Sequence, residues 1–196
     1  MNTRAITMTI AFAVLAIVLN PAISGVGVPF PPIPTLLYNI WEIVIIAAFL
    51  LMGFKGGISV ALLNSAFLFA VYPGPANSIY ALGNSVAVSS MMVGVYLANK
   101  LTRRSSQAEA TSGVRTVTLS TVLAMLLRVV VMAPIMYAIL HYNIVFVPAD
   151  VTESVIITLV LPLQAVYNVT IALYTIPLGY LTAKVVNRNL KVGNKI

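Results

Sequence analysis

The sequence has 196 residues, of which 60% are hydrophobic and only 8% are charged, and its mean hydropathy is +1.02. Soluble domains are about half apolar and about a quarter charged, so this composition excludes an ordinary soluble protein and indicates an integral membrane protein. The chain has no cysteine, which excludes disulfides, thiolate metal sites and a cysteine nucleophile. Its net charge of +7 would suit a nucleic-acid partner in a soluble protein, but here the cations follow a topological pattern and no nucleic acid is expected.

Six apolar segments follow one another along the chain, and most reach the ~20 residues that cross ~30 Å of hydrocarbon. We therefore expect an all-α integral membrane protein, with residues 1–196 forming a single membrane domain of six transmembrane helices. The first segment is the shortest, and the last is long enough to tilt or to extend past the bilayer. The segments cover approximately residues 5–19, 36–54, 56–71, 78–98, 114–140 and 155–186.

The positions of the cations predict the orientation of the chain, because Lys and Arg collect in cytoplasmic loops. If the chain crosses six times, the outside segments 20–35, 72–77 and 141–152 carry no Lys or Arg. We therefore expect a multi-pass protein of the plasma membrane with both termini in the cytoplasm. The cations on the cytoplasmic side would be Arg4, Lys55, Lys100, Arg103, Arg104, Arg115, Lys184, Arg188, Lys191 and Lys195.

The first segment has two interpretations. Arg4, the short apolar run and the small residues after Pro21 also resemble a cleavable secretory signal, which would leave five helices. Against cleavage, small residues recur on one side of this helix, and such a stripe allows another helix to approach closely. The stripe would contact either a partner subunit or the protein's own neighbouring helices. Its residues are Ala5, Thr9, Ala13 and Ala16.

Residues 20–35 form the longest outside segment, with five prolines and two glycines. This composition argues against regular helix and favours stiff, extended chain. The segment is also apolar, so it would either cap a site at the membrane surface or pack onto the ends of the helices.

The sequence carries no motif for nucleotide binding of the G-x-x-x-x-G-K-[ST] type, no histidine cluster and no Ser/His/Asp set. We therefore expect no enzyme activity, no cofactor, no metal ion and no ATP hydrolysis by this chain. The single histidine, His141, falls at an outer helix end and is interpreted as an interfacial residue.

Polar groups at membrane depth are the remaining candidates for function, since they are costly there and mark sites or pathways. Arg128 lies near the middle of segment 114–140, and Glu42 lies near the outer end of segment 36–54. Either these two residues pair with each other, or Arg128 faces an anionic group of a ligand.

Carboxamides and aromatic side chains share the outer half of the expected bundle. Together they would form a pocket with aromatic walls and a few orienting polar groups, which is typical of a small-molecule site. The alternatives are hydrogen bonds between helices for the amides and an interfacial belt for the aromatics. With Glu42 and Arg128, the substrate-binding candidates are Asn39, Tyr80, Asn84, Tyr137, Gln164, Tyr167 and Asn168.

The chain resembles the substrate-binding S components of energy-coupling factor (ECF) vitamin transporters, particularly the riboflavin-specific branch. The resemblance runs over nearly the whole chain and consists of weak motifs in the right order. They are Arg4 before an alanine-rich helix, Asn39-Ile-Trp-Glu42 after the proline-rich segment, residues 47–58 with Gly53 and Gly57, Asn64, Gly83-Asn84, the stretch from Val130 through Met132 and Tyr137 to Pro148, and Leu161-Pro162.

The resemblance implies a six-helix S component that binds a vitamin at its outer face, with riboflavin or a related flavin as the first expectation. It also implies partners, a membrane T component that docks on the first helix and two ATPase subunits. The chain departs from the riboflavin binders at Met136, Gln164 and Tyr167, and Arg128 has no counterpart, so the ligand could instead be anionic. Two other functions stay open, a stand-alone secondary transporter or facilitator and a non-transporting assembly subunit.

Overall fold

The computed structural model describes residues 3–71, 74–105, 113–142 and 152–190 of the protein. Within these residues, four helical segments are long and apolar enough to cross a membrane: Trp41–Val71, Ser78–Thr102, Val114–His141 and Glu153–Asn189. The elements in chain order are α1 (Thr3–Leu19), α2 (Pro21–Ser24), β1 (Val28–Phe30), β2 (Ile33–Tyr38), α3 (Trp41–Val71), α4 (Pro75–Ser105), α5 (Val114–His141), α6 (Glu153–Val155), the π-helical turn η1 (Ile156–Val160) and α7 (Leu161–Leu190).

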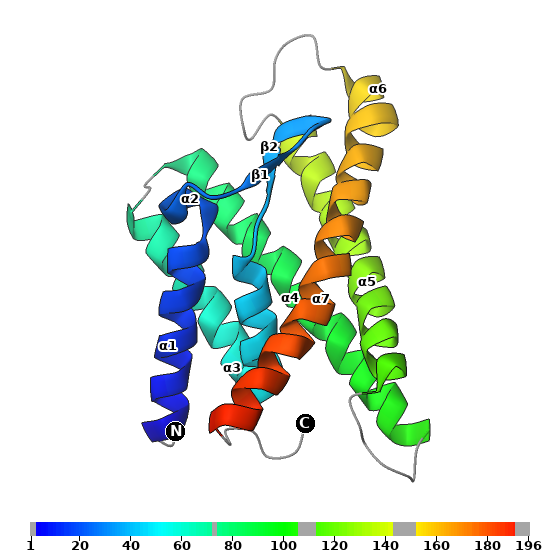
Figure 1. Ribbon diagram of the computed structural model, residues 1–196. Coiled ribbons are helices and arrows are strands. Elements are labelled where there is room, and N and C mark those ends of the chain that lie inside the picture. The colour runs from blue at the N-terminus through cyan, green and yellow to red at the C-terminus, as the bar shows by residue number, and fades with distance from the viewer. Residues whose placement is uncertain (1–2, 72–73, 106–112, 143–151, 191–196) are drawn as a thin grey trace.

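Helices α3, α4, α5 and α7 form a ring around a common core (Figure 1). Helix α4 packs against α3 and α5, α7 also packs against α3 and α5, and α1 lies outside the ring against α3. The core contains fully buried apolar side chains from several of these helices, including Ile45, Met91 and Ile176. A Cβ atom on Gly94 of α4 would lie 2.6 Å from the Cα atom of Ala124 on α5, so a residue without a side chain is what lets these two backbones approach.

Helix α1 begins and α7 ends at the same end of the bundle, which we call the lower end because Figure 1 draws it there. Apart from Arg128, the cations of the described helices lie near this end. Arg4 is in the first turn of α1, Lys55 follows the turn in α3, Lys100, Arg103 and Arg104 are close to the end of α4, Arg115 is in the first turn of α5, and Lys184 and Arg188 are near the end of α7. Lys191 and Lys195 lie outside the described residues. The opposite end is the upper end.

Helix α3 is a helical hairpin broken at Gly53, whose φ of 76° and ψ of −173° are not helical. A Cβ atom on Gly57 would lie 2.6 Å from the Cβ atom of Phe49, eight residues earlier. In a continuous helix eight residues span about 12 Å, so the two arms run in opposite directions. The sequence placed the helix break at this position, between segments 36–54 and 56–71.

Two predictions about the segment between α1 and α3 were wrong. The proline-rich residues were expected to exclude helix, but Pro21 opens the helical turn α2, because a proline at the first helical position loses no hydrogen bond. The Asn20 side chain caps this turn at the Ala22 amide, 3.1 Å away, and Gly25 ends it with a φ of 66°. The residues at 36–38 were expected to be helical, but they belong to β2.

Strands β1 and β2 form an antiparallel hairpin at the upper end of the bundle, beside α7 (Figure 1). Val28 pairs with Tyr38 and Pro29 with Leu37, and the register becomes irregular before Phe30. The extended chain continues almost to Trp41, since tyrosine hydroxyls of α7 bind the backbone carbonyls of Leu37 and Asn39 and hold these residues out of the helix.

The other helices extend somewhat beyond the predicted segments. Helix α4 reaches from Pro75 to Ser105 rather than from residue 78 to 98, and the last helical stretch starts at Glu153. That stretch contains the π-helical turn η1 directly before Pro162. Pro162 has no amide hydrogen to continue the helical ladder, and the Leu161 amide instead bonds to the Ile156 carbonyl, five residues back.

Candidate functional site

Arg128 of α5 lies in the middle of the ring. It contacts one residue from each of the other three ring helices. Its terminal nitrogens bind both carboxylate oxygens of Glu42 on α3, with an Nη2–Oε1 distance of 3.1 Å. Its Nε donates to Oδ1 of Asn168 on α7 at 2.9 Å, and its Nη1 lies 3.3 Å from the sulfur of Met91 on α4. We call these four residues the polar floor.

The polar floor is an internally neutral unit inside the bundle. Arg128 is 2% exposed and Glu42 is 1% exposed, so both charges are removed from water. A buried charge without a partner is strongly destabilising. The bidentate contact with Glu42 supplies that partner for Arg128. The structure therefore has the pairing that the sequence offered as one of two alternatives for Arg128.

Above the polar floor, side chains on the inner side of the ring become more exposed toward the upper end. On α4, Asn84, Val88 and Met91 are spaced four and three residues apart and share one side of the helix. Val88 and Met91 are completely buried, whereas Asn84, nearer the upper end, is exposed. The inner side of α5 changes in the same way, from buried Arg128 to half-buried Ile135 seven residues later. We call this region of the ring the upper opening.

Gln164 places a side-chain amide beside the polar floor. It lies one helical turn above Asn168 on α7, on the same side of the helix, and it is only 3% exposed. Its amide makes no hydrogen bond with any residue that the structure describes. Because an amide offers both donors and an acceptor, Gln164 is able to bind a polar group that enters from above.

The β-hairpin is attached to α7 by tyrosine side chains. Tyr167 donates to the Leu37 carbonyl at 2.7 Å, and the Tyr174 hydroxyl both donates to the Asn39 carbonyl at 2.6 Å and accepts from the Asn39 amide at 3.2 Å. Tyr38 shares a 3.0 Å hydrogen bond with Thr170. These contacts fix the hairpin over the side of the ring where the first arm of α3 begins.

The same tyrosines form an aromatic cluster with a residue of β1. The ring of Tyr167 lies 5.7 Å from Phe30 and 5.4 Å from Tyr38, and Tyr38 lies 6.4 Å from Tyr174. Phe30 is buried in this cluster although its strand is largely exposed. Apolar residues of the hairpin therefore pack onto α7, which agrees with one of the two uses expected for the proline-rich segment.

The predicted site residues fall into three groups in the structure. Glu42, Arg128 and Asn168 meet in the polar floor, with Gln164 directly above. Asn39 and Tyr167 lie at the seam between the hairpin and α7, where the Asn39 side-chain amide donates to the Leu37 carbonyl at 3.2 Å. Tyr80, Asn84 and Tyr137 lie on the upper halves of α4 and α5 and make no contact with the polar floor.

Tyr137 belongs to a small cluster at the upper end of α5. Its hydroxyl donates to Glu153 at 2.6 Å, and the ring of His141 stacks on it with centroids 5.2 Å apart. Pro148, part of the family resemblance, lies outside the described residues. The cluster links α5 to α6 and forms one side of the upper end.

Some residues of the site were not predicted from the sequence. Met91 gave no signal, because a methionine in an apolar helix is indistinguishable from ordinary core. Tyr174 could have been found, since it lies seven residues after Tyr167 and so on the same side of the helix. Tyr38 and Phe30 could be placed only once the hairpin was known.

The small residues of α1 are used inside the protein. Thr9, Ala13 and Ala16 are 6%, 4% and 0% exposed, and the hydroxyl of Thr9 bonds to the Ala5 carbonyl at 2.9 Å. Of the two uses expected for this stripe, the structure therefore shows contact with the protein's own helices. Ile6 and Ile10, on a neighbouring side of α1, are 42% and 54% exposed.

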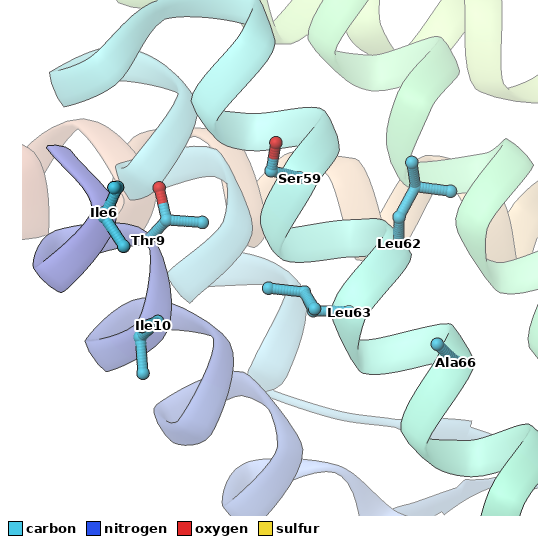
Figure 2. A pocket seen from close by; sticks show the side chains of 7 residues that line it. All are labelled: Ile6, Thr9, Ile10, Ser59, Leu62, Leu63 and Ala66. Carbon is cyan, nitrogen blue, oxygen red and sulfur yellow. The ribbon is translucent and has the colours of Figure 1, made fainter. Parts of the chain in front are cut away.

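An open groove of about 460 Å³ runs between α1 and the second arm of α3. Figure 2 shows that its walls carry almost only apolar side chains, with the hydroxyls of Thr9 and Ser59 as the polar groups. It lies on the outside of the ring, away from the polar floor. Its lining residues are Ile6, Thr9, Ile10, Ser59, Leu62, Leu63 and Ala66.

Comparison with solved structures relates the chain to a transporter subunit. It matches the S component of a bacterial ECF transporter with a TM-score of 0.73, covering 97% of this chain and 99% of that chain at 15% sequence identity. The fold is similar to that of an ECF S component. No protein-family model matches the sequence, and no curated protein matches it.

The matched protein is a component of a transporter. At this low sequence identity the similarity concerns the fold, so the chemistry of the site has to be argued from the residues of this chain.

Proposed function

We propose that the protein is the substrate-binding S component of an ECF-type vitamin importer in the plasma membrane. It would cross the bilayer six times, with α1, the two arms of α3, α4, α5 and α7 as the spans. The lower end, where the cations lie, would face the cytoplasm, in agreement with the positive-inside rule. The observation that carries this proposal is the similarity of fold over almost the whole chain.

The vitamin would bind in the upper opening, above the polar floor. Asn84 and Gln164 would orient its polar edge, because one is exposed on the inner side of α4 and the other has an unused amide. Tyr80 and Tyr137 would provide aromatic contacts near the surface, and the β-hairpin would cover the site from the side of α7. Riboflavin or a related flavin is the first ligand to test.

Uptake would need partner subunits, a membrane T component and two ATPase subunits. The groove between α1 and α3 supports docking of a partner helix, because it is apolar, open and on the outside of the ring. Docking there would use Ile6 and Ile10 together with the groove, since most of the small-residue stripe is buried. The stripe residues Thr9, Ala13 and Ala16 would then position α1 from within.

The test is binding by the purified chain alone, followed by transport. We expect a flavin or another vitamin to bind one-to-one in detergent or nanodiscs, measured by native mass spectrometry and by quenching of flavin fluorescence. In liposomes the chain alone should give no sustained uptake. Sustained uptake without ATPase subunits would indicate a stand-alone transporter, and no binding to a full vitamin panel would contradict a substrate-binding role.

A further inference from the structure

We propose that the cargo of this protein is uncharged, and that Glu42 determines this selectivity by neutralising Arg128 in the polar floor. The inference rests on the proposed function and deepens it, because it assigns a chemical class to a ligand of the upper opening. It also decides between the two ligand charges that the sequence left open.

Arg128 is the one cation among the described residues that lies away from the lower end. No Lys or Arg occurs at residues 5–54, 56–99 or 129–183, so the residues that form the upper half of the protein contain no second fixed positive charge. At the upper end the described residues instead present the exposed carboxylate of Glu153. An anionic solute would therefore depend on Arg128 alone.

The charge of Arg128 is already neutralised by Glu42. Each of its three nitrogens has a partner, with Glu42 on the two terminal nitrogens and Asn168 on Nε. An anion that took the place of Glu42 on these nitrogens would leave a buried carboxylate without a partner. Such a loss corresponds to on the order of 100-fold or more in an equilibrium constant.

A cationic solute meets the same difficulty from the other side. Both carboxylate oxygens of Glu42 bind Arg128, and Glu42 is the one acidic residue among the described residues at that depth. The floor therefore has no net charge to offer to a ligand of either sign.

Neutral hydrogen-bonding groups remain available beside the floor. Among the described residues, neither the Gln164 amide nor the Nδ2 group of Asn168 has a hydrogen-bond partner. Two carboxamides are suited to carbonyl and N–H groups, such as those of an amide, imide or ureido unit. The expected cargo is an uncharged small molecule that carries such a unit.

The test compares pairs of probes that share a skeleton and differ in charge: riboflavin and FMN, nicotinamide and nicotinate, biotinamide and biotin. We expect the neutral member of every pair that binds the wild-type protein to bind at least about 10-fold more tightly. In Glu42→Gln, which leaves Arg128 charged, this preference should shrink or reverse. The control Lys184→Gln removes an exposed charge near the end of α7, far from the upper opening, and should leave the preference unchanged.

Glu42→Gln could fail to fold, so the double variant Glu42→Met/Arg128→Met provides a second measurement. Its floor has no charge at all, and it should keep the preference for neutral probes. Tighter binding of the ionised members to the wild-type protein, or an unchanged preference in folded Glu42→Gln, would overturn the inference while leaving the S-component function intact. If no probe and no other vitamin binds the wild-type protein, the proposed function fails and this inference fails with it.

Discussion

The hydroxyl of Tyr167 donates a 2.7 Å hydrogen bond to the backbone carbonyl of Leu37, 130 residues earlier in the chain. This bond attaches the β-hairpin to α7 at the point where the extended chain leads into α3. The hairpin is thereby held against α7 at the upper end of the bundle.

Tyr167→Phe should loosen the hairpin without unfolding the helices. Loss of one hydrogen bond of this kind costs about 1 kcal/mol, which corresponds to roughly 5-fold faster opening. Hydrogen exchange measured by mass spectrometry should show faster exchange in β1 and β2. Tyr96→Phe, which removes an exposed hydroxyl from α4, serves as the control, and equal exchange in both variants would argue against the attachment.

Arg128→Met should be strongly destabilising, because it leaves the Glu42 carboxylate buried without a partner. Breaking a buried ion pair costs about 3–5 kcal/mol, whereas replacing both partners by apolar residues is often neutral. We therefore expect the double variant Glu42→Met/Arg128→Met to recover most of the loss. Unfolding by denaturing detergent in mixed micelles measures both effects.

The control for the ion pair is Arg115→Met, which removes an exposed cation at the start of α5. It should change the unfolding free energy by less than about 1 kcal/mol. A double variant as unstable as Arg128→Met alone would show that the pair does not account for the loss.

Gly53→Ala should destabilise the helical hairpin of α3. The backbone of Gly53, with φ of 76° and ψ of −173°, lies in a region that is essentially restricted to glycine. The expected cost is about 1–3 kcal/mol in the free energy of unfolding. Gly83→Ala is the matched control, because Gly83 is helical and has no atom within 4 Å of an added Cβ. It should be neutral or stabilising by up to about 1 kcal/mol, and similar losses in both variants would contradict a special role for Gly53.

Asn84→Leu and Gln164→Leu should each weaken ligand binding, since both amides are assigned to the polar edge of the ligand. The loss of one hydrogen bond with a buried group left unpaired costs about 1–3 kcal/mol, or about 5-fold to 150-fold in affinity. Titration of the purified variants with the ligand of the wild-type protein measures this loss.

Asn64→Leu is the control for these amides. Asn64 is 1% exposed, both polar atoms of its side chain lack a partner, and it lies on α3 outside the assigned site. Its substitution should leave affinity unchanged and should not lower stability. Wild-type affinity in both Asn84→Leu and Gln164→Leu would remove these residues from the site.

The parts of the fold that were predictable are those that local sequence controls. Hydropathy located the long helices, and the glycines at 53–57 located the reversal in α3, because apolar length and positive φ are local properties. The partner of Arg128 was also predicted as one of two alternatives. A charge at membrane depth needs a neutralising group, and Glu42 was the acidic residue nearest to it in depth.

The β-hairpin and its attachment could not be predicted in the same way. They depend on contacts such as Tyr38 with Thr170, 132 residues apart, which leave no local pattern. Depth along a helix also does not determine which side a residue faces. Asn84 and Asn168 were grouped by depth, yet one is exposed and the other is bonded to Arg128.

The central claim, that the upper opening holds a small solute, is tested most directly by native mass spectrometry of the protein freshly purified from its own membranes. The account predicts a one-to-one noncovalent adduct with the mass of a neutral vitamin, which Gln164→Leu reduces and Asn64→Leu retains. A chain that carries no adduct, and that gains none on addition of a complete vitamin panel, would contradict it.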